Sequence, residues 1–327
     1  MTTTPIHDPH GITWGMHPIA WRNDDIPEVG EWNTIDVMFD DLAATGYAGT
    51  EVAGWYPPKE EVKEKADAHG LAIVAQWFSS FIVRDGIDAV VPPFRDNCEY
   101  LQYLGATRIV VSEQTGSVQG ARDICIFDNK PVLTDEQWPV LAEGLNHLGA
   151  IAHEYGLELV YHHHLGTVVQ TKDETLKMLE LTDPAVVSLL FDTGHAYVGD
   201  GDVMGLLRGA IDRIKHVHFK DVRPDKMAES RQAKRSFLDS FLAGMFTVPG
   251  DGAIDFTEPY DFLVSHGYDQ WILVEAEQDP TIAPRSSTRA SRATTSRQPC
   301  WVSEPRRAIP RIPARNRKGA EATFSVR

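Results

Sequence analysis

Short apolar runs that end in polar residues alternate along the chain with stretches in which apolar residues recur every three or four positions. Eight such runs are present, at residues 11–21, 46–55, 71–80, 106–114, 157–164, 186–195, 214–222 and 271–279. Short continuous apolar runs predict buried strands, and the spacing between them, as in TIDVMFDDLAAT and KDETLKMLELTDP, predicts amphipathic helices. Strands that alternate with helices are typical of a parallel sheet.

The number of these units predicts the fold. Eight strand and helix pairs over about 270 residues favour a single (β/α)8 TIM barrel, an α/β fold that commonly occupies ~250 residues. A doubly wound open sheet is the alternative, but no G-x-G-x-x-G turn follows the first run, so NAD or NADP binding has little support. Residues 115–134 and 223–253 follow the fourth and seventh runs as long insertions, and we expect them to form a lid or a pocket wall.

Charge divides the chain into an acidic body and a basic tail. Residues 285–327 hold eleven Lys and Arg against two Asp and Glu, which leaves 20 basic and 45 acidic side chains in residues 1–284. An acidic body repels phosphate backbones, which argues against nucleic acid as a partner. We expect a flexible N-terminus at residues 1–10, a barrel at 11–282 and a separate tail at 283–327.

The tail changes in composition at one point. It is rich in Arg, Ser, Thr, Ala and Pro, and its prolines prevent a long helix. We interpret it as disordered and as the product of an altered reading frame, because no periodicity survives there. A basic tail that binds a partner is the alternative.

The sequence does not show a signal peptide, a membrane-spanning run or a cysteine framework. The opening MTTTPIHDPH does not resemble a signal peptide, and no apolar run reaches the ~18 residues of a membrane helix. Cys98, Cys125 and Cys300 lack CxxC spacing, which argues against a disulfide framework and a cysteine metal site. We therefore expect a cytoplasmic protein with no membrane partner.

Polar side chains that could take part in chemistry follow the apolar runs. They are Glu51, Glu113, His162, His163, His164, Asp192, His195, His216, His218, Lys220, Glu275 and Glu277. Side chains alternate along a strand, so His162 and His164 share one face and His163 points to the other. Imidazoles and carboxylates that converge from the fifth to the eighth strands predict a site for a divalent ion such as Mn²⁺, Co²⁺, Fe²⁺ or Zn²⁺.

Several of these residues also have simpler interpretations. Asp192 could cap the following helix, which is a common role of Asp. His216 is more often a hydrogen-bonded core residue than a ligand. We interpret Glu51 as an ordinary strand-end carboxylate, and Glu277 could be solvated at the start of a loop. His163, on the opposite face of its strand, is expected to pack against or support the site.

Longer stretches of the sequence resemble a known family. HPIAWRNDDIPEVG, VVSEQTGSVQG, VYHHHLGTVVQT, LLFDTGHAYVGD, KHVHFKDVRP and WILVEAEQDP are similar to motifs of the myo-inosose-2 dehydratases of bacterial inositol catabolism, which are xylose-isomerase-like TIM barrels. The resemblance implies dehydration of 2-keto-myo-inositol (scyllo-inosose), a small polyol ketone, to 3D-3,5/4-trihydroxycyclohexane-1,2-dione. It also implies Mn²⁺ or Co²⁺ as the metal, and glutathione as a further cofactor of the family.

The resemblance also implies a set of metal ligands. In the wider superfamily, the metal is held by Glu on the fifth strand, Asp on the sixth, His on the seventh and Glu on the eighth. Asp192, His218 and Glu275 match the last three of these positions, and His162 stands where relatives have the Glu. His164 is the alternative ligand from the fifth strand.

The implied reaction assigns further roles. Loss of water from a β-hydroxy ketone needs a base for the α-proton and an acid for the leaving hydroxyl. We expect His164 and Lys220 to supply these two functions in either order, and Glu113, His195 and Glu277 to bind substrate hydroxyls. A keto-sugar isomerase or epimerase, an endonuclease and a non-catalytic sugar-binding barrel are alternatives, and a homo-oligomer is left open.

Overall fold

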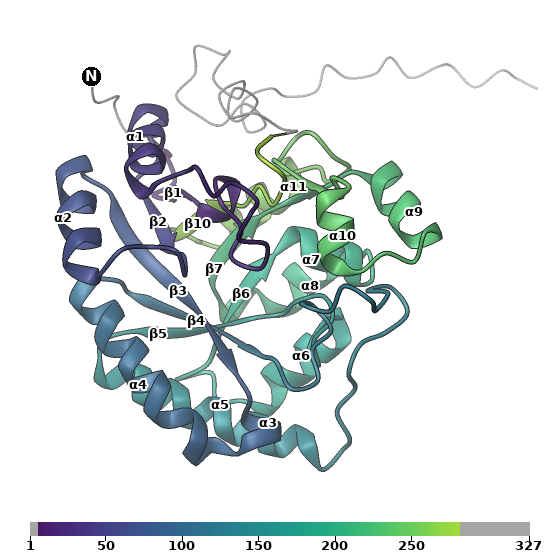
Figure 1. The fold of residues 1–327 in the computed structure, drawn as a ribbon. Coiled ribbons are helices and arrows are strands. Elements are labelled where there is room, and N and C mark those ends of the chain that lie inside the picture. Colours follow the sequence, from purple (N-terminus) through teal and green to yellow (C-terminus); the bar gives the residue numbers. More distant parts are fainter. Residues whose placement is uncertain (1–5, 282–327) are drawn as a thin grey trace, which may run out of the picture.

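The part of the chain that can be described is the predicted barrel. A computed structural model describes residues 6–281 of the 327. Within them, eight parallel strands form a closed barrel with helices around its outside (Figure 1), which confirms the predicted fold. The predictions for the tail at 283–327 and for the first five residues of the N-terminal segment lie outside the described residues.

The barrel closes through the first strand, which pairs with both the second and the last. The order around the barrel is β1-β10-β7-β6-β5-β4-β3-β2, and neighbouring strands are parallel. Its strands are β1 (Thr13–Met16), β2 (Gly49–Val52), β3 (Ala72–Ser80), β4 (Arg108–Glu113), β5 (Glu158–His162), β6 (Ser188–Asp192), β7 (Ile214–Phe219) and β10 (Trp271–Val274). Two short strands, β8 (Asp221–Val222) and β9 (Phe246–Thr247), form a separate antiparallel ribbon.

Helices occupy the connections that follow the strands. They are α1 (Ile35–Thr45), α2 (Lys59–His69), α3 (Ile82–Asp85), α4 (Ile87–Leu104), α5 (Gln137–Glu154), α6 (Lys172–Leu181), α7 (Thr193–Gly199), α8 (Val203–Ala210), α9 (Pro224–Gln232), α10 (Phe237–Leu242) and α11 (Thr257–Ser265), with the 3-10 helices η1 (Pro18–Ala20) and η2 (Ile211–Arg213). Local signals fix their ends: α6 begins with a capping box between Thr171 and Glu174, and α1 ends at Gly46 with a φ of 87°.

Apolar side chains form separate clusters on the two faces of the barrel wall. The larger cluster packs strands against helices through residues such as Phe39, Phe94 and Leu145. A small cluster includes Val74, Val110 and Leu190, and Val110 also lines the cavity described below, which places this cluster inside the barrel. The inner layer therefore fills the barrel below the C-terminal ends of the strands, where polar residues take over.

Several predicted strands are shorter than expected. The first ends at Met16, because the His17 side chain accepts a hydrogen bond from Ile19 N and Pro18 begins η1, so the rest of the run at 11–21 is not a strand. The seventh run divides into β7 and β8, and the eighth strand ends at Val274. The loop that follows β1 is thus available to the C-terminal face.

The two insertions pack over that face together with the loop after β1. A third apolar cluster joins Ile26 of this loop, Ile126 of the first insertion, and Phe237, Phe241 and Phe246 of the second. The first insertion, 115–134, contains no helix or strand, whereas the second includes α9, α10 and β9. The insertions thus lie where a pocket wall is expected.

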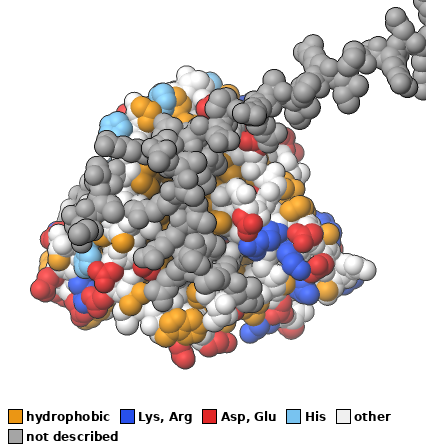
Figure 2. Space-filling model, turned by 90° about the horizontal axis from the view of Figure 1, so that it is seen from above, with side chains coloured by type: hydrophobic (Ala, Val, Ile, Leu, Met, Phe, Trp, Pro, Cys, Tyr) orange, Lys and Arg blue, Asp and Glu red, His pale blue; other side chains and the backbone are white. Residues whose placement is uncertain are grey.

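The surface and the helices add two observations. Among residues 6–281, no helix combines the length and apolar character needed to cross a bilayer. Figure 2 shows acidic and basic side chains beside one another on the part of the drawn face that the grey atoms do not cover.

Candidate active site and metal centre

The C-terminal ends of the strands surround a cavity of about 580 Å³, within the usual range for ligand sites. Six of the nine predicted site residues line it: His162, His164, His195, His218, Glu275 and Glu277. Asp192 and Lys220 are fully buried and contact this lining. The structure therefore brings eight of the nine predicted site residues together, and Glu113 is the exception.

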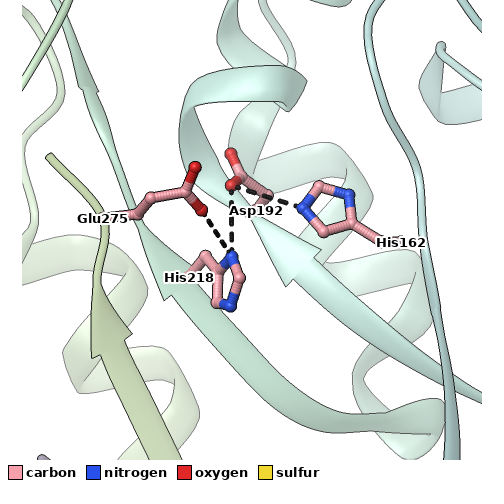
Figure 3. Close-up of side chains that lie close together, drawn as sticks. All are labelled: His162, Asp192, His218 and Glu275. Atoms are coloured by element: carbon pink, nitrogen blue, oxygen red, sulfur yellow. Dashed lines mark ion pairs between the residues drawn. The ribbon is translucent and has the colours of Figure 1, made fainter. Parts of the chain in front are cut away.

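Four of these residues form a compact group at the ends of neighbouring strands. His162, Asp192, His218 and Glu275 each offer one ligand atom, and these atoms all lie within 4.8 Å of one another. We call these four residues the metal group. Figure 3 shows their polar atoms pointing toward one another, with Asp192 between His162 and His218. The pairing of Asp192 with His218 across β6 and β7 fixes two members of the group through strand register.

Hydrogen bonds outside the group fix which nitrogen of each imidazole faces inward. His162 Nδ1 lies 2.7 Å from the carbonyl oxygen of His163, which can only accept, so Nδ1 carries the proton and Nε2 presents a lone pair 3.8 Å from Asp192 Oδ2. His218 Nε2 donates to Glu51 Oε1 over 2.8 Å, which leaves Nδ1 toward Asp192 and Glu275. Partners of this kind orient metal ligands and set their tautomers.

The group also contains polar atoms that lack partners. Asp192 Oδ1 accepts from His195 N at 2.7 Å and caps α7, but its buried Oδ2 has no hydrogen-bond partner among the described residues. His218 Nδ1 lies 2.6 Å from Glu275 Oε2 without hydrogen-bond alignment. Two carboxylates and two imidazoles that converge in this way fit a divalent metal ion, and the capping role of Asp192 is compatible with that function.

The charges around His218 lead to the same conclusion. Burial opposes a proton on this imidazole, but Glu51 and Glu275 outweigh burial and raise the pKa of His218 to about 10. Burial raises the pKa of Asp192 to about 6, although Lys220 acts against this effect. The carboxylates therefore stabilise a positive charge at this point, and either a proton or a metal ion can supply it.

Lys220 is held as an ammonium ion by the surrounding carboxylates. Its Nζ lies 2.6 Å from Glu275 Oε1 and 2.9 Å from Glu277 Oε2, and 4.0 Å from Asp192 Oδ2. Burial alone would lower the pKa of Lys220, but Glu275, Glu277 and Asp192 together raise it above its usual value. Of the two roles open to Lys220, this geometry favours proton donation over proton removal.

The buried stem of Lys220 needs space that a glycine provides. A Cβ added to Gly194, in the turn after β6, would lie 2.6 Å from Lys220 Cγ. The FDTGH sequence therefore serves the site at three positions: Asp192 in the metal group, Gly194 beside the lysine, and His195, whose Nε2 lies 3.1 Å from Lys220 Nζ.

His164 presents a free nitrogen on the other side of His195. The two rings lie 3.8 Å apart between centroids, and Phe237 packs against both. His164 Nδ1 donates to the carbonyl oxygen of Leu165 over 2.8 Å, so Nε2 keeps its lone pair. Burial, with the charge of Lys220, lowers the pKa of His164 to about 3, which keeps this imidazole neutral.

Glu277 is a carboxyl group whose pKa lies close to neutral pH. Burial raises its pKa to about 7, even though Lys220 acts in the opposite direction. It lines the cavity and is 3% exposed, so it is not the solvated loop residue of the simpler interpretation. A carboxyl group with such a pKa can both accept and donate protons near neutral pH.

Glu51 has a larger role than the sequence indicated. It is 1% exposed, and its Oε1 accepts hydrogen bonds from His216 Nε2 at 2.7 Å and His218 Nε2 at 2.8 Å. Its Oε2 lies 3.5 Å from His17 Nε2. Interpreting it as an ordinary strand-end carboxylate was therefore wrong, whereas His216 is the hydrogen-bonded core residue that was expected.

Two other strand-end residues lie outside the cavity lining. Glu113 accepts hydrogen bonds from Ser80 Oγ at 2.6 Å and from Ile82 N at 2.9 Å, so its carboxylate stabilises the start of α3 instead of reaching the substrate space. His163 Nε2 accepts from Asp192 N at 3.3 Å. His163 thus supports the backbone of the metal group from behind, as strand alternation suggested.

Comparisons with known proteins agree with this geometry. The family model described as xylose isomerase-like TIM barrel matches residues 39–297. The inosose dehydratase of Salmonella typhimurium is 56% identical over 270 residues, which cover 82% of this chain and 90% of that protein. The inosose dehydratase of Bacillus velezensis is 53% identical over 272 residues, covering 83% and 91%. Among solved structures, the IOLI protein with a binding zinc atom has a TM-score of 0.62 at 15% identity, covering 84% of this chain and 92% of that one.

The closed parallel barrel and the buried His and carboxylate group at its C-terminal end define a xylose isomerase-like TIM barrel. Within that class, the chain belongs to the inosose dehydratase family. The family that the sequence motifs resembled is thereby confirmed. The solved structure at 15% identity supports the fold alone.

Proposed function

We propose that this chain is a hydro-lyase that dehydrates 2-keto-myo-inositol to 3D-3,5/4-trihydroxycyclohexane-1,2-dione in inositol catabolism. The observation that carries the proposal is the identity of 56% to an inosose dehydratase over 90% of that protein's length. The geometry supports it independently, because a buried metal group, a neutral imidazole and an ammonium ion adjoin one cavity. These are the parts that elimination from a β-hydroxy ketone requires.

The metal group supplies the electrophilic part of this chemistry. We assign His162, Asp192, His218 and Glu275 as the ligands. A divalent ion held by these residues would supply Lewis-acid stabilisation of negative charge on the ketone oxygen. The mixed nitrogen and oxygen donors suit Mn²⁺ or Co²⁺, the metals of the prediction.

We assign the proton transfers to residues whose surroundings favour the charge state that each role needs. His164 Nε2, with its lone pair free, removes the proton from the α-carbon. Lys220 Nζ donates a proton to the β-hydroxyl, which leaves as water. The double bond forms between the α- and β-carbons, and because the α-carbon carries a hydroxyl, the product is an enol that tautomerises to the 1,2-diketone. His195 and Glu277, which flank Lys220, orient it and bind substrate hydroxyls.

Aromatic side chains keep bulk water from these groups. Phe237 packs on His164 and His195, and Phe246 lies with its ring centroid 4.7 Å from Lys220 Nζ. Both belong to the second insertion, which thus forms a wall of the site. Low water content strengthens the electrostatic contacts of the ammonium ion and the metal group.

The test is an assay of purified chain stripped of metal. Adding Mn²⁺ or Co²⁺ should restore formation of the diketone from 2-keto-myo-inositol, followed by its absorbance, and a chelator should abolish it. Absence of diketone at every metal concentration, with the ketone still bound, would instead identify a sugar-binding barrel. Glutathione as a cofactor, a homo-oligomer and a cytoplasmic location stay predictions.

A further inference from the structure

A second set of unsatisfied polar atoms lies in the cavity, apart from the metal group. Four buried side-chain atoms have no hydrogen-bond partner among the described residues: Arg22 Nε, Asn23 Nδ2, Trp55 Nε1 and Gln119 Oε1. All four of these residues line the cavity. They come from the loop after β1, the segment after β2 and the first insertion. Buried polar atoms without partners are uncommon in proteins, and a concentration in one cavity points to a ligand.

Asn23 is the most tightly held of the four. It is 1% exposed, and its Oδ1 accepts hydrogen bonds from Asp25 N at 2.7 Å and Ile26 N at 2.9 Å. These two donors fix the orientation of the amide, so the position of Nδ2 is fixed as well. Its burial costs free energy unless a ligand accepts a hydrogen bond from it.

Neighbouring contacts also hold Gln119 and Arg22. Gln119 Nε2 donates to Asp25 Oδ2 over 3.3 Å, which leaves Oε1 as the free acceptor. The Arg22 guanidinium lies 5.6 Å from the ring centroid of Trp55. The polar atoms are thus arranged in advance of binding.

The chemistry of these atoms identifies the kind of ligand. Three of them donate hydrogen bonds and Gln119 Oε1 accepts, a combination that hydroxyl groups satisfy because each hydroxyl can do both. An anion would leave Gln119 Oε1 without a donor and would face Asp24 and Asp25, which line the same cavity. A neutral molecule with several hydroxyls therefore fits better than a carboxylate or a phosphate.

We propose that Arg22, Asn23 and Gln119 form a hydroxyl-recognition subsite, which binds ring hydroxyls of the substrate that take no part in the elimination. The identity of that substrate as a polyol ketone rests on the proposed function. We assign these contacts to uniform binding, of equal strength in the ground state and the transition state, and loss of such a contact raises KM and leaves kcat unchanged. A site built to bond hydroxyls rejects analogues that lack them, because its polar atoms are then left unpaired.

The sharpest variant is Asn23→Asp. It keeps Oδ1 as the acceptor for the two loop N–H groups and replaces only the NH₂ donor. Asn146→Asp is a matched control, since Asn146 Oδ1 also accepts from a backbone N–H, that of Asp183, but the residue does not line the cavity. Arg22→Met and Gln119→Met remove the other two groups and retain side-chain bulk, and thermal melting checks that each variant folds.

Two measurements test the subsite. Binding of myo-inositol, which has the ring hydroxyls but no ketone, is measured by calorimetry on the full chain. KM and kcat are measured on 2-keto-myo-inositol with metal. We expect Asn23→Asp to weaken myo-inositol binding and raise KM by about tenfold or more, with kcat within about threefold, and Asn146→Asp to change neither.

The outcomes separate this proposal from the proposed function. Unchanged binding and KM in all three subsite variants would overturn the subsite, as would failure of the wild-type chain to bind myo-inositol. A wild-type chain that binds myo-inositol through Asn23 but forms no diketone would uphold the subsite and overturn the proposed function. A kcat that falls with KM unchanged would assign these residues to the chemistry instead of to recognition.

Discussion

Replacement of Lys220 by Met tests the assignment of the proton donor. The side chain is fully buried, and its ammonium group lies 2.6 Å from Glu275 and 2.9 Å from Glu277. Met keeps most of the aliphatic stem beside Gly194 but removes the charge and the proton. The variant Lys220→Met therefore leaves two buried carboxylates without their cation.

The expected magnitudes follow from these contacts. Loss of a general acid lowers kcat by roughly 10²–10⁴-fold. This corresponds to about 3–5 kcal/mol of activation free energy, since each tenfold change is about 1.36 kcal/mol. Removing one partner of a buried ion pair costs about 3–5 kcal/mol of folding free energy, although proton uptake by Glu277 will offset part of this loss. Metal affinity should not fall, because Lys220 is a positive charge beside the metal group and not one of its ligands.

The assay compares Lys220→Met with Lys63→Met, whose lysine forms only an exposed pair with Asp67 on α2. Single-turnover rates, bound metal per chain and thermal melting are measured for both at a temperature where both are folded. The control should match the wild-type chain in all three. Turnover by Lys220→Met within about threefold of the wild-type rate, with metal bound, would refute the assignment of Lys220 as the acid.

Three further predictions concern the metal group and its support. Glu51→Gln should weaken metal binding about 10–100-fold in calorimetry, because Glu51 orients His218; unchanged affinity would show that this hydrogen bond is dispensable. Metal affinity should rise about tenfold per pH unit between pH 6 and 9, because a bound ion must displace the proton that His218 holds up to a pKa of about 10. As the pH falls below the Asp192 pKa of about 6, metal affinity should decrease more steeply. A metal affinity that does not change with pH would contradict this coupling. Gly194→Ala should displace Lys220 and lower kcat about tenfold or more while metal content is kept, because its Cβ would lie 2.6 Å from Lys220 Cγ; wild-type kcat would show that the lysine can shift without loss.

Strand periodicity predicted the barrel because a parallel sheet buries both faces of each strand and leaves polar residues at the ends. Because strand ends of a barrel converge, the same reasoning predicted a metal site at the ends of the fifth to eighth strands, and the family resemblance implied His162, Asp192, His218 and Glu275 as its ligands. Alternation along β5 also separated His163 from its two neighbours. These features depend on local residue patterns and on the way in which barrel strands converge, and both can be inferred from a sequence.

The residues that sequence reasoning missed depend on contacts between distant segments. Glu51 and His216 are 165 positions apart, and nothing in either neighbourhood indicates that they meet. Arg22 and Asn23 follow the apolar run at 11–21 directly, but Pro18 starts a 3-10 helix there, so these two residues belong to a loop that the strand pattern did not predict. Glu113 occupies a strand end like the others, yet the start of α3 supplies donors that hold its carboxylate away from the cavity.

The central claim is that the metal group activates a ketone for loss of water. It is tested most directly by incubating the metal-loaded chain with 2-keto-myo-inositol in D₂O and identifying the products by mass spectrometry. The account predicts a diketone that has lost one water and carries one solvent deuterium on the former β-carbon, where the enol is protonated, and that forms only when metal is present. Recovery of deuterium-labelled ketone or of its isomer, with no loss of water, would contradict it and would identify an isomerase or epimerase.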